Sequence, residues 1–139
     1  MALFAWFILS LFSPTPQPLS LTITSSVPEA GNLHLAIYDS GEGFASRKEL
    51  LSIVRPSTGK PVSLEVNLPA SGKYVLAAFH DLNGNGKLDT NLFGAPVEPY
   101  GFSEQPPSKW REPRFEEIAT SVTTGSETIR IDLKKWKEY

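Results

Sequence analysis

The chain has 139 residues, no cysteine and a formal net charge of -2, with 13 basic and 15 acidic residues. This length predicts one domain, and the absence of cysteine excludes disulfide bonds. The charges are scattered and form no basic stripe, so we expect no nucleic-acid partner.

The first part of the chain is apolar and uncharged. Residues 2–12 are apolar except Ser10, and no charged residue precedes Glu29. A membrane-spanning helix needs about 20 apolar residues, so this shorter run is typical of a secretory signal, although no basic residue follows Met1. We predict a signal peptide over residues 1–18, a single domain over residues 19–139, a periplasmic or extracellular location, and no stable membrane span in the mature chain.

Alternation of apolar and polar residues predicts strands over residues 19–24, 33–38 and 61–68. In the second strand, Leu33, Leu35 and Ile37 share one face and His34 lies on the other. Between the second and third strands, Ser46 and Glu49 have the spacing of a capping box, which predicts a short helix through about Ile53. Residues 74–79 are apolar on both sides and predict a central strand.

The second half of the chain contains one long loop and two more predicted strands. Residues 81–114 are rich in proline and glycine, and residues 115–123 and 127–133 flank Thr124-Gly125-Ser126, which predicts a closing hairpin. About seven short strands with one short helix indicate an all-β fold, namely an antiparallel β-sandwich of immunoglobulin-like or transthyretin-like type. Periodicity does not distinguish these two topologies.

The start of the long loop, "HDLNGNGKLDTN", is rich in oxygen-bearing side chains. It matches positions one, three, five, six, seven and nine of an EF-hand-type calcium loop, but position twelve, normally a glutamate, is Leu92. We assign the missing ligand to Glu98, with Asn91 in reserve. The predicted Ca²⁺ ligands are Asp81, Asn83, Asn85, Lys87 through its carbonyl, Asp89 and Glu98.

Such a site would bind with a dissociation constant of about 0.1 to 1 mM. The alternative interpretation of the loop needs no ion. The two Asn-Gly pairs, at residues 83–84 and 85–86, also predict tight turns. Both interpretations stay open at this point.

Histidines and aromatic residues give two further hypotheses. His80, Asp81 and Glu98 form the candidate set for a metal-assisted envelope hydrolase. We instead expect His80 to end its strand and hold the base of the loop, and His34 to be an ordinary exposed residue.

Tyr100, Phe102 and Trp110 are candidates for a groove that binds a glycan or peptide. Aromatic residues in a long loop more often hold that loop against the core. We favour this second role for them.

The central block, residues 77–91 and 94–103, resembles the secreted bacterial proteins called domain of unknown function 2141. The Tyr-Asp-Ser and Phe segment within residues 31–44 and the Pro-x-Phe-x-x-x-Ala segment of residues 113–119 resemble the same family. The resemblance implies an exported β-sandwich and carries no established activity. We therefore predict a noncatalytic module with a binding or structural role in the cell envelope, whose partner is an envelope protein or glycan.

Overall fold

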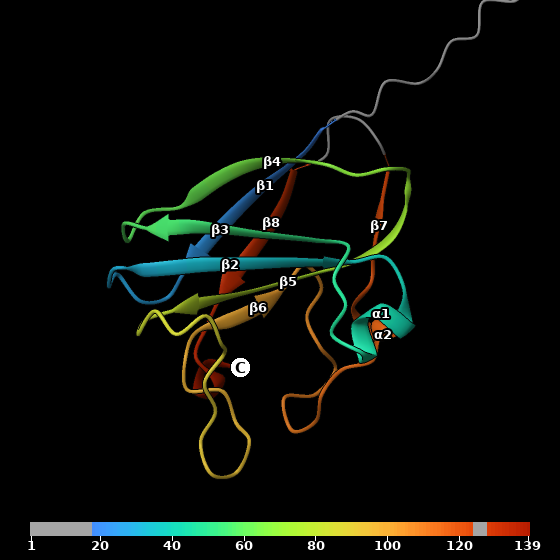
Figure 1. Cartoon of the computed structure of the whole chain (residues 1–139). Helices are drawn as coiled ribbons and strands as arrows, with labels where there is room; N and C mark the ends of the chain where they lie inside the picture. The colour runs from blue at the N-terminus through green and yellow to red at the C-terminus, as the bar shows by residue number, and fades with distance from the viewer. Residues whose placement is uncertain (1–17, 124–127) are drawn as a thin grey trace, which may run out of the picture.

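The computed structural model describes residues 18–123 and 128–139, and the strands in this part of the chain form two β-sheets (Figure 1). The three-stranded sheet has the order β4-β1-β8 and the five-stranded sheet has the order β3-β2-β5-β6, with β7 also paired to β5. The strands are β1 (Pro18–Ser25), β2 (Gly31–Tyr38), β3 (Leu51–Ser57), β4 (Val62–Asn67), β5 (Gly72–Asp81), β6 (Tyr100–Phe102), β7 (Thr120–Val122) and β8 (Thr128–Leu133). The predicted signal peptide lies outside the described residues except for Pro18, which begins β1.

The main core lies between the two sheets. Side chains on a strand alternate between its faces, so every second residue of a strand enters the core. Leu33, Leu35 and Ile37 do so from β2, as their spacing predicts, and each is at most 2% exposed. The other strands contribute Leu19, Leu21, Ile23, Val66, Leu76, Ala78, Ile131 and Leu133.

Strand β5 lies in the middle of its sheet and buries residues on both faces. Tyr74 and Leu76 enter the main core, whereas Val75 enters a second cluster with Tyr38, Phe44 and Ile118. This second cluster lies under two short helices, α1 (Gly41–Ala45) and α2 (Phe115–Ile118). The prediction of a central strand covered on both faces is therefore confirmed.

The prediction of a helix from Ser46 to about Ile53 is wrong. Helix α1 comes earlier, because the Ser40 hydroxyl accepts a hydrogen bond from the Gly43 amide at 3.1 Å, and Ser46 is the residue that ends it. The predicted second half of the helix is strand β3, which pairs with β2. Leu51, Ser52 and Ile53 alternate between apolar and polar, which favours a strand at this edge of the sheet. This preference outweighs the capping-box spacing of Ser46 and Glu49.

The predicted closing hairpin is also wrong. Residues 115–118 form helix α2, in which the Glu117 carboxylate accepts the Arg114 amide at 2.9 Å and Ile118 is fully buried. Strand β7 then pairs with β5, while β8 pairs in parallel with β1. The other strand pairs among the described residues are antiparallel, and the predicted turn at residues 124–126 lies outside them.

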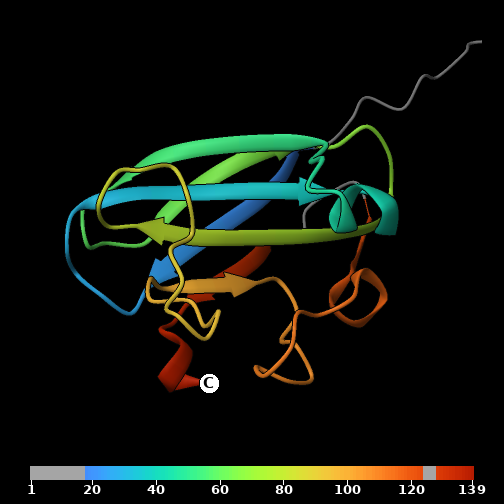
Figure 2. The same cartoon turned by 60° about the horizontal axis from the view of Figure 1, so that its bottom comes forward.

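The two sheets are joined where β6 meets the end of β8. Tyr100 and Lys134 exchange two backbone hydrogen bonds of 3.0 Å each. Beyond this junction, the chain ends in a short 3₁₀ helix, η1 (Trp136–Glu138), which lies near the loop that follows β6 (Figure 2). No helix in the described ranges combines the length and the apolar character that crossing a membrane requires.

Candidate functional site

The oxygen-rich loop begins at Asp81, whose side chain is 1% exposed. Its Oδ1 accepts hydrogen bonds from the amides of Gly84 at 2.8 Å and Asn85 at 3.2 Å. Its Oδ2 accepts from the Gly86 amide at 2.8 Å and lies 3.2 Å from His34 Nε2. Burial alone would raise the pKa of Asp81, but these backbone donors outweigh it and hold the pKa below the usual 3.8.

Asn83, Asn85 and Asp89 converge at the centre of the loop. The Asn83 amide donates to Asp89 Oδ2 at 2.6 Å, and the Asn85 amide donates to Asp89 Oδ1 at 2.8 Å. The side-chain oxygens of the two asparagines accept from the backbone amides of Asn85 and Lys87. Gly84 and Gly86 make the chain reversal feasible, with φ angles of 75° and 76° that other residues rarely adopt. The loop is therefore closed by its own hydrogen bonds.

Glu98 joins the two ends of this loop. Its carboxylate accepts from the Leu82 amide at 2.9 Å and from the Asp89 amide at 3.1 Å, and its side chain is 4% exposed. Of the six predicted calcium ligands, Asn83, Asn85 and Asp89 therefore converge, while Asp81 and Glu98 direct their carboxylates to backbone amides. The backbone amide of the sixth, Lys87, donates to the Asn85 side chain at 2.9 Å. Within residues 18–123 and 128–139, no group of three acidic, histidine or cysteine side chains is arranged to hold a metal ion.

Asn91, the reserve ligand, has a different role. Its side-chain oxygen accepts hydrogen bonds from the amides of Phe93 at 2.9 Å and Ala95 at 3.1 Å. Its backbone also exchanges hydrogen bonds with Gly94 and Ala95. Asn91 thus closes a second turn, residues 91–95, further along the loop.

His80 holds the base of the loop as expected, whereas His34 is more engaged than expected. His80 is fully buried in β5, with Nδ1 2.8 Å from the Ser25 hydroxyl, while its backbone amide donates to Pro99 at 2.8 Å. The backbone of His80 therefore holds the end of the loop at Pro99, and its ring contacts β1 through Ser25. His34 is not an ordinary exposed residue, because it stacks on Phe79 at 4.6 Å and contacts Asp81.

The candidate hydrolase set, His80, Asp81 and Glu98, is at most 4% exposed throughout. Each carboxylate accepts backbone hydrogen bonds within the loop. A substrate has no access to groups buried in this way, so the arrangement does not favour hydrolysis at this position.

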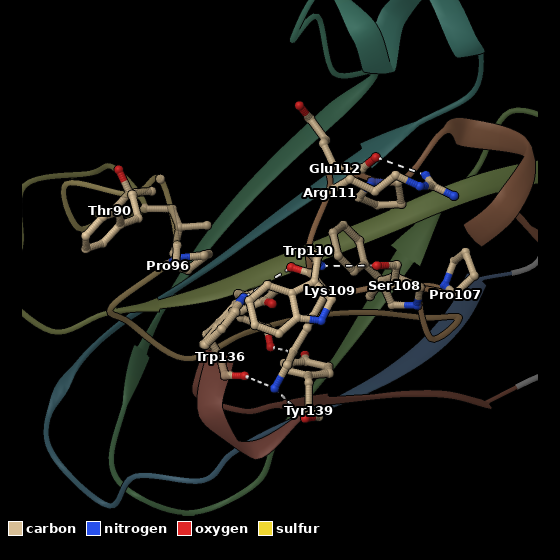
Figure 3. Close-up of a pocket in the computed structure, with 18 of the residues that line it drawn as sticks. Thr90, Pro96, Pro107, Ser108, Lys109, Trp110, Arg111, Glu112, Trp136 and Tyr139 are labelled. Carbon is tan, nitrogen blue, oxygen red and sulfur yellow. Dashed lines mark hydrogen bonds between the residues drawn. The ribbon is translucent and has the colours of Figure 1, made fainter.

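A large hollow among the described residues lies elsewhere. A cavity of about 850 Å³ separates residues 90–96, residues 105–113 and the C-terminal segment (Figure 3). A second hollow, of about 310 Å³, continues from it over the outer face of β2 and β5, since both are lined by Arg47, Leu88, Tyr100 and Phe102. The aromatic residues of the larger cavity are Phe93, Tyr100, Phe102, Trp110, Trp136 and Tyr139.

Two tryptophans and one lysine lie together in the lining of this cavity. The rings of Trp110 and Trp136 meet edge to face at 4.9 Å, and Lys109 Nζ lies 4.5 Å from the Trp136 ring centre and 5.7 Å from that of Trp110. The Trp136 indole donates to the Lys109 carbonyl at 3.1 Å, which fixes the ring orientation. Trp110 nevertheless remains 78% exposed.

Tyr139 holds the C-terminal segment against β6. Its hydroxyl donates to the Tyr100 carbonyl at 2.5 Å, and the two rings lie 5.0 Å apart. Burial raises the pKa of both tyrosines. Tyr100 and Phe102 therefore secure the loop as expected, whereas Trp110 does not.

Sequence reasoning missed Trp136 and Tyr139. Their signal was the segment Lys-Lys-Trp-Lys-Glu-Tyr that ends the chain, in which two aromatic residues stand among charged ones. Nothing in that segment indicates that it folds back beside residues 105–113, about 25 positions earlier.

A family model described as "Uncharacterized protein conserved in bacteria (DUF2141)" matches residues 21–130. The match covers β2 to β7 and the whole oxygen-rich loop, together with parts of β1 and β8. No curated protein and no solved structure gives a significant match to the chain.

Proposed function

The chain belongs to this family of proteins conserved in bacteria, and from its geometry we propose that it is an exported, noncatalytic binding module of the cell envelope. The aromatic cavity is its binding site, and a saccharide chain of the envelope is its ligand. The apolar leader before Glu29 supports export to the periplasm or the exterior. The two facing sheets support a β-sandwich of immunoglobulin-like or transthyretin-like type.

The observation that carries this proposal is the exposed Trp110 ring beside Trp136. Sugar rings have apolar C–H faces that pack on aromatic rings, and their hydroxyl groups need polar partners at the edges. The cavity offers both, because Gln105, Ser108 and Arg111 lie among its aromatic residues. The edge-to-face pair leaves one large indole surface open to solvent.

The polar groups of the cavity support binding without catalysis. Glycoside hydrolysis generally uses two carboxyl groups on opposite sides of the scissile bond. Glu112 is the one acidic side chain among the described residues that line the cavity, and it is paired with Arg47. No histidine lines the cavity in that part of the chain.

Tryptophan fluorescence tests the saccharide site directly. The sequence has three tryptophans, of which Trp6 falls in the predicted signal peptide and the other two line the cavity. We expect solubilised peptidoglycan glycan strands to change the emission of the exported protein. Trp110→Ala should weaken binding, measured by calorimetry, by about tenfold or more, because central aromatic residues dominate binding energies.

Val54→Ala is the matched control, since Val54 is a 45% exposed apolar residue outside the cavity. This variant should bind the glycan strands like the original chain. Equal binding by Trp110→Ala and Val54→Ala would place the ligand elsewhere and contradict the proposal.

The oxygen-rich loop supports a second part of the proposal, a weak structural Ca²⁺ site. The convergence of Asn83, Asn85 and Asp89 supports such a site, because hydrogen bonds of 2.6 to 3.1 Å join these three residues. At present the side-chain N–H groups of Asn83 and Asn85 face Asp89. Ca²⁺ binding would require these two side chains to turn their oxygens, in place of the N–H groups, toward an ion beside Asp89. With so few carboxylates the affinity stays in the range of about 0.1 to 1 mM.

Thermal unfolding tests this site. A dissociation constant of about 0.2 mM and about 2 mM Ca²⁺ give roughly 1.4 kcal/mol of stabilisation, which raises Tm by a few degrees above its value in EDTA. Asp89→Asn, which keeps the side-chain size, should abolish the shift. Asp39→Asn, in another exposed turn, should retain it. Identical Tm values with EDTA and Ca²⁺ in the original chain would leave the loop as a turn without an ion.

A further inference from the structure

The turn of residues 91–95 carries the most exposed large apolar side chains of the described residues. Leu92 is 101% exposed and Phe93 is 94% exposed. Trp110, 78% exposed, belongs to the neighbouring loop, and Phe93 and Trp110 line the same cavity. Both loops project from the same end of the molecule (Figure 1). Leaving such side chains in water is unfavourable unless another apolar phase receives them.

Four of the five backbone amides of this turn donate hydrogen bonds within the turn itself. The amides of Phe93 and Ala95 donate to the Asn91 side chain, and the Gly94 amide donates to the Asn91 carbonyl at 3.0 Å. The Asn91 amide donates to the Ala95 carbonyl at 2.9 Å. A segment that enters a lipid interface must not expose unpaired backbone donors, because no water replaces the lost partner. The amides of Asn91, Phe93, Gly94 and Ala95 meet this condition, whereas an ordinary solvated loop has no need to.

A basic and aromatic segment lies beside the turn. Residues 134–137 read Lys-Lys-Trp-Lys, and Trp136 lines the same cavity as Phe93. Lys134 Nζ lies 6.0 Å from the Tyr139 ring centre and Lys109 Nζ lies over Trp136. Lys109 Nζ donates to the main-chain oxygens of Trp136 at 3.5 Å and Tyr139 at 2.8 Å. Lys134 forms no ion pair with an Asp or Glu side chain of the described residues, unlike Arg47 and Arg111. Tryptophan flanked by lysines is typical of the interface between a bilayer and water.

We propose that this end of the protein docks on a membrane surface with anionic headgroups. The side chains of Leu92 and Phe93 enter the acyl boundary, Trp110 lies at headgroup depth, and the lysines of residues 134–137 contact lipid phosphates. The proposal goes beyond the saccharide site, and its test does not depend on any saccharide. Each lysine near an anionic surface adds to the attraction, and added salt screens it.

The absence of cysteine from the chain provides a specific test. Leu92→Cys, labelled with an environment-sensitive fluorophore, reports whether the turn enters lipid. Lys60→Cys, in the exposed turn between β3 and β4, is the matched control. The full chain is used for both, so any contribution of its first residues is the same. The probes are vesicles of phosphatidylcholine, alone or mixed with phosphatidylglycerol.

We expect the label at residue 92 to shift to shorter wavelength on phosphatidylglycerol vesicles and much less on phosphatidylcholine alone, while the label at residue 60 does not respond. Phe93→Ser should weaken the partitioning of the labelled chain by about tenfold, since it removes one buried aromatic side chain. Lys135→Gln with Lys137→Gln should lower it by a similar factor and reduce its salt dependence.

Two results would overturn the proposal. One is a label at residue 92 that does not respond to phosphatidylglycerol vesicles or that responds equally to both kinds of vesicle. The other is a shift at residue 92 produced by soluble envelope proteins without vesicles, which would identify the turn as a protein-binding surface. Circular dichroism of each variant establishes that the fold is retained.

Discussion

His80 shows how a single residue links the loop to the sheets. It is fully buried next to Ser25 of β1, and a Cβ atom at Gly31 would lie 2.9 Å from its Nε2. Burial lowers the pKa of the imidazole below its usual 6.5, and the attraction of Glu29 and Glu98 does not cancel this effect. The folded protein therefore holds His80 neutral.

This pKa shift predicts a loss of stability in mildly acidic solution. The unfolded chain takes up a proton near pH 6.5, whereas the folded chain does so only at lower pH. The stabilisation is thus fully present above pH 6.5 and declines as the pH falls toward the folded-state pKa, by at most about 1.4 kcal/mol per pH unit. Urea unfolding between pH 7 and pH 5 measures the slope.

His80→Gln removes the titrating group. The free energy of unfolding of this variant should therefore change little between pH 7 and pH 5, whether the variant is more or less stable than the original chain. His34→Gln removes the only other histidine and should keep the slope. Parallel slopes for His80→Gln and the original chain would assign the pH dependence to another group. The aspartates and glutamates with lowered pKa values act in a more acidic range.

At the scale of elements, the junction of β6 and β8 sets the shape of the cavity. Gly101 lies so close to β8 that a Cβ atom would come within 2.7 Å of the Asp132 carbonyl oxygen. This close approach lets Tyr100 and Lys134 bond to each other and brings Trp136 and Tyr139 beside residues 105–113. A larger residue at position 101 would separate the two sheets at this edge.

Gly101→Ala should therefore destabilise the fold by about 1–3 kcal/mol, the usual result of overpacking. Gly72→Ala is the control, because its Cβ would find the nearest atom, on Tyr74, at an ordinary 3.8 Å. Its free energy of unfolding in urea should remain within about 0.5 kcal/mol of the original. Similar losses in both variants would mean that strand propensity, and not the contact with Asp132, decides the outcome.

The elements also differ in how far the sequence determines them. Strands β1, β2, β4 and β8 bury one face in the main core, so the period of two in their sequences predicts them. Helix α2 escapes prediction because its start depends on Glu117, which accepts hydrogen bonds from Arg111 and Arg114. Strand β6 has three residues, too few for any period, and exists through its contacts with β5 and β8.

At the scale of the whole molecule, the fold class and the turn-rich loop could be predicted from the sequence, but the contacts between distant segments could not. The sequence correctly indicated an all-β chain of this family and a turn-rich loop after β5. It did not indicate which oxygens would face the centre of that loop, because Asp81 and Glu98 are engaged by backbone amides that sequence spacing does not reveal. The cavity escaped prediction for a similar reason, since Trp110 and Trp136 meet only after both sheets have formed.

The parallel pairing of β1 with β8 has a consequence for the order of folding. Strand β1 lies between β4 and β8, so this sheet is complete only after β8 has been synthesised. Contacts between distant parts of a sequence form slowly, because a long loop must close before any of them is made. A nascent chain of this design therefore cannot complete its three-stranded sheet until β8 has left the ribosome.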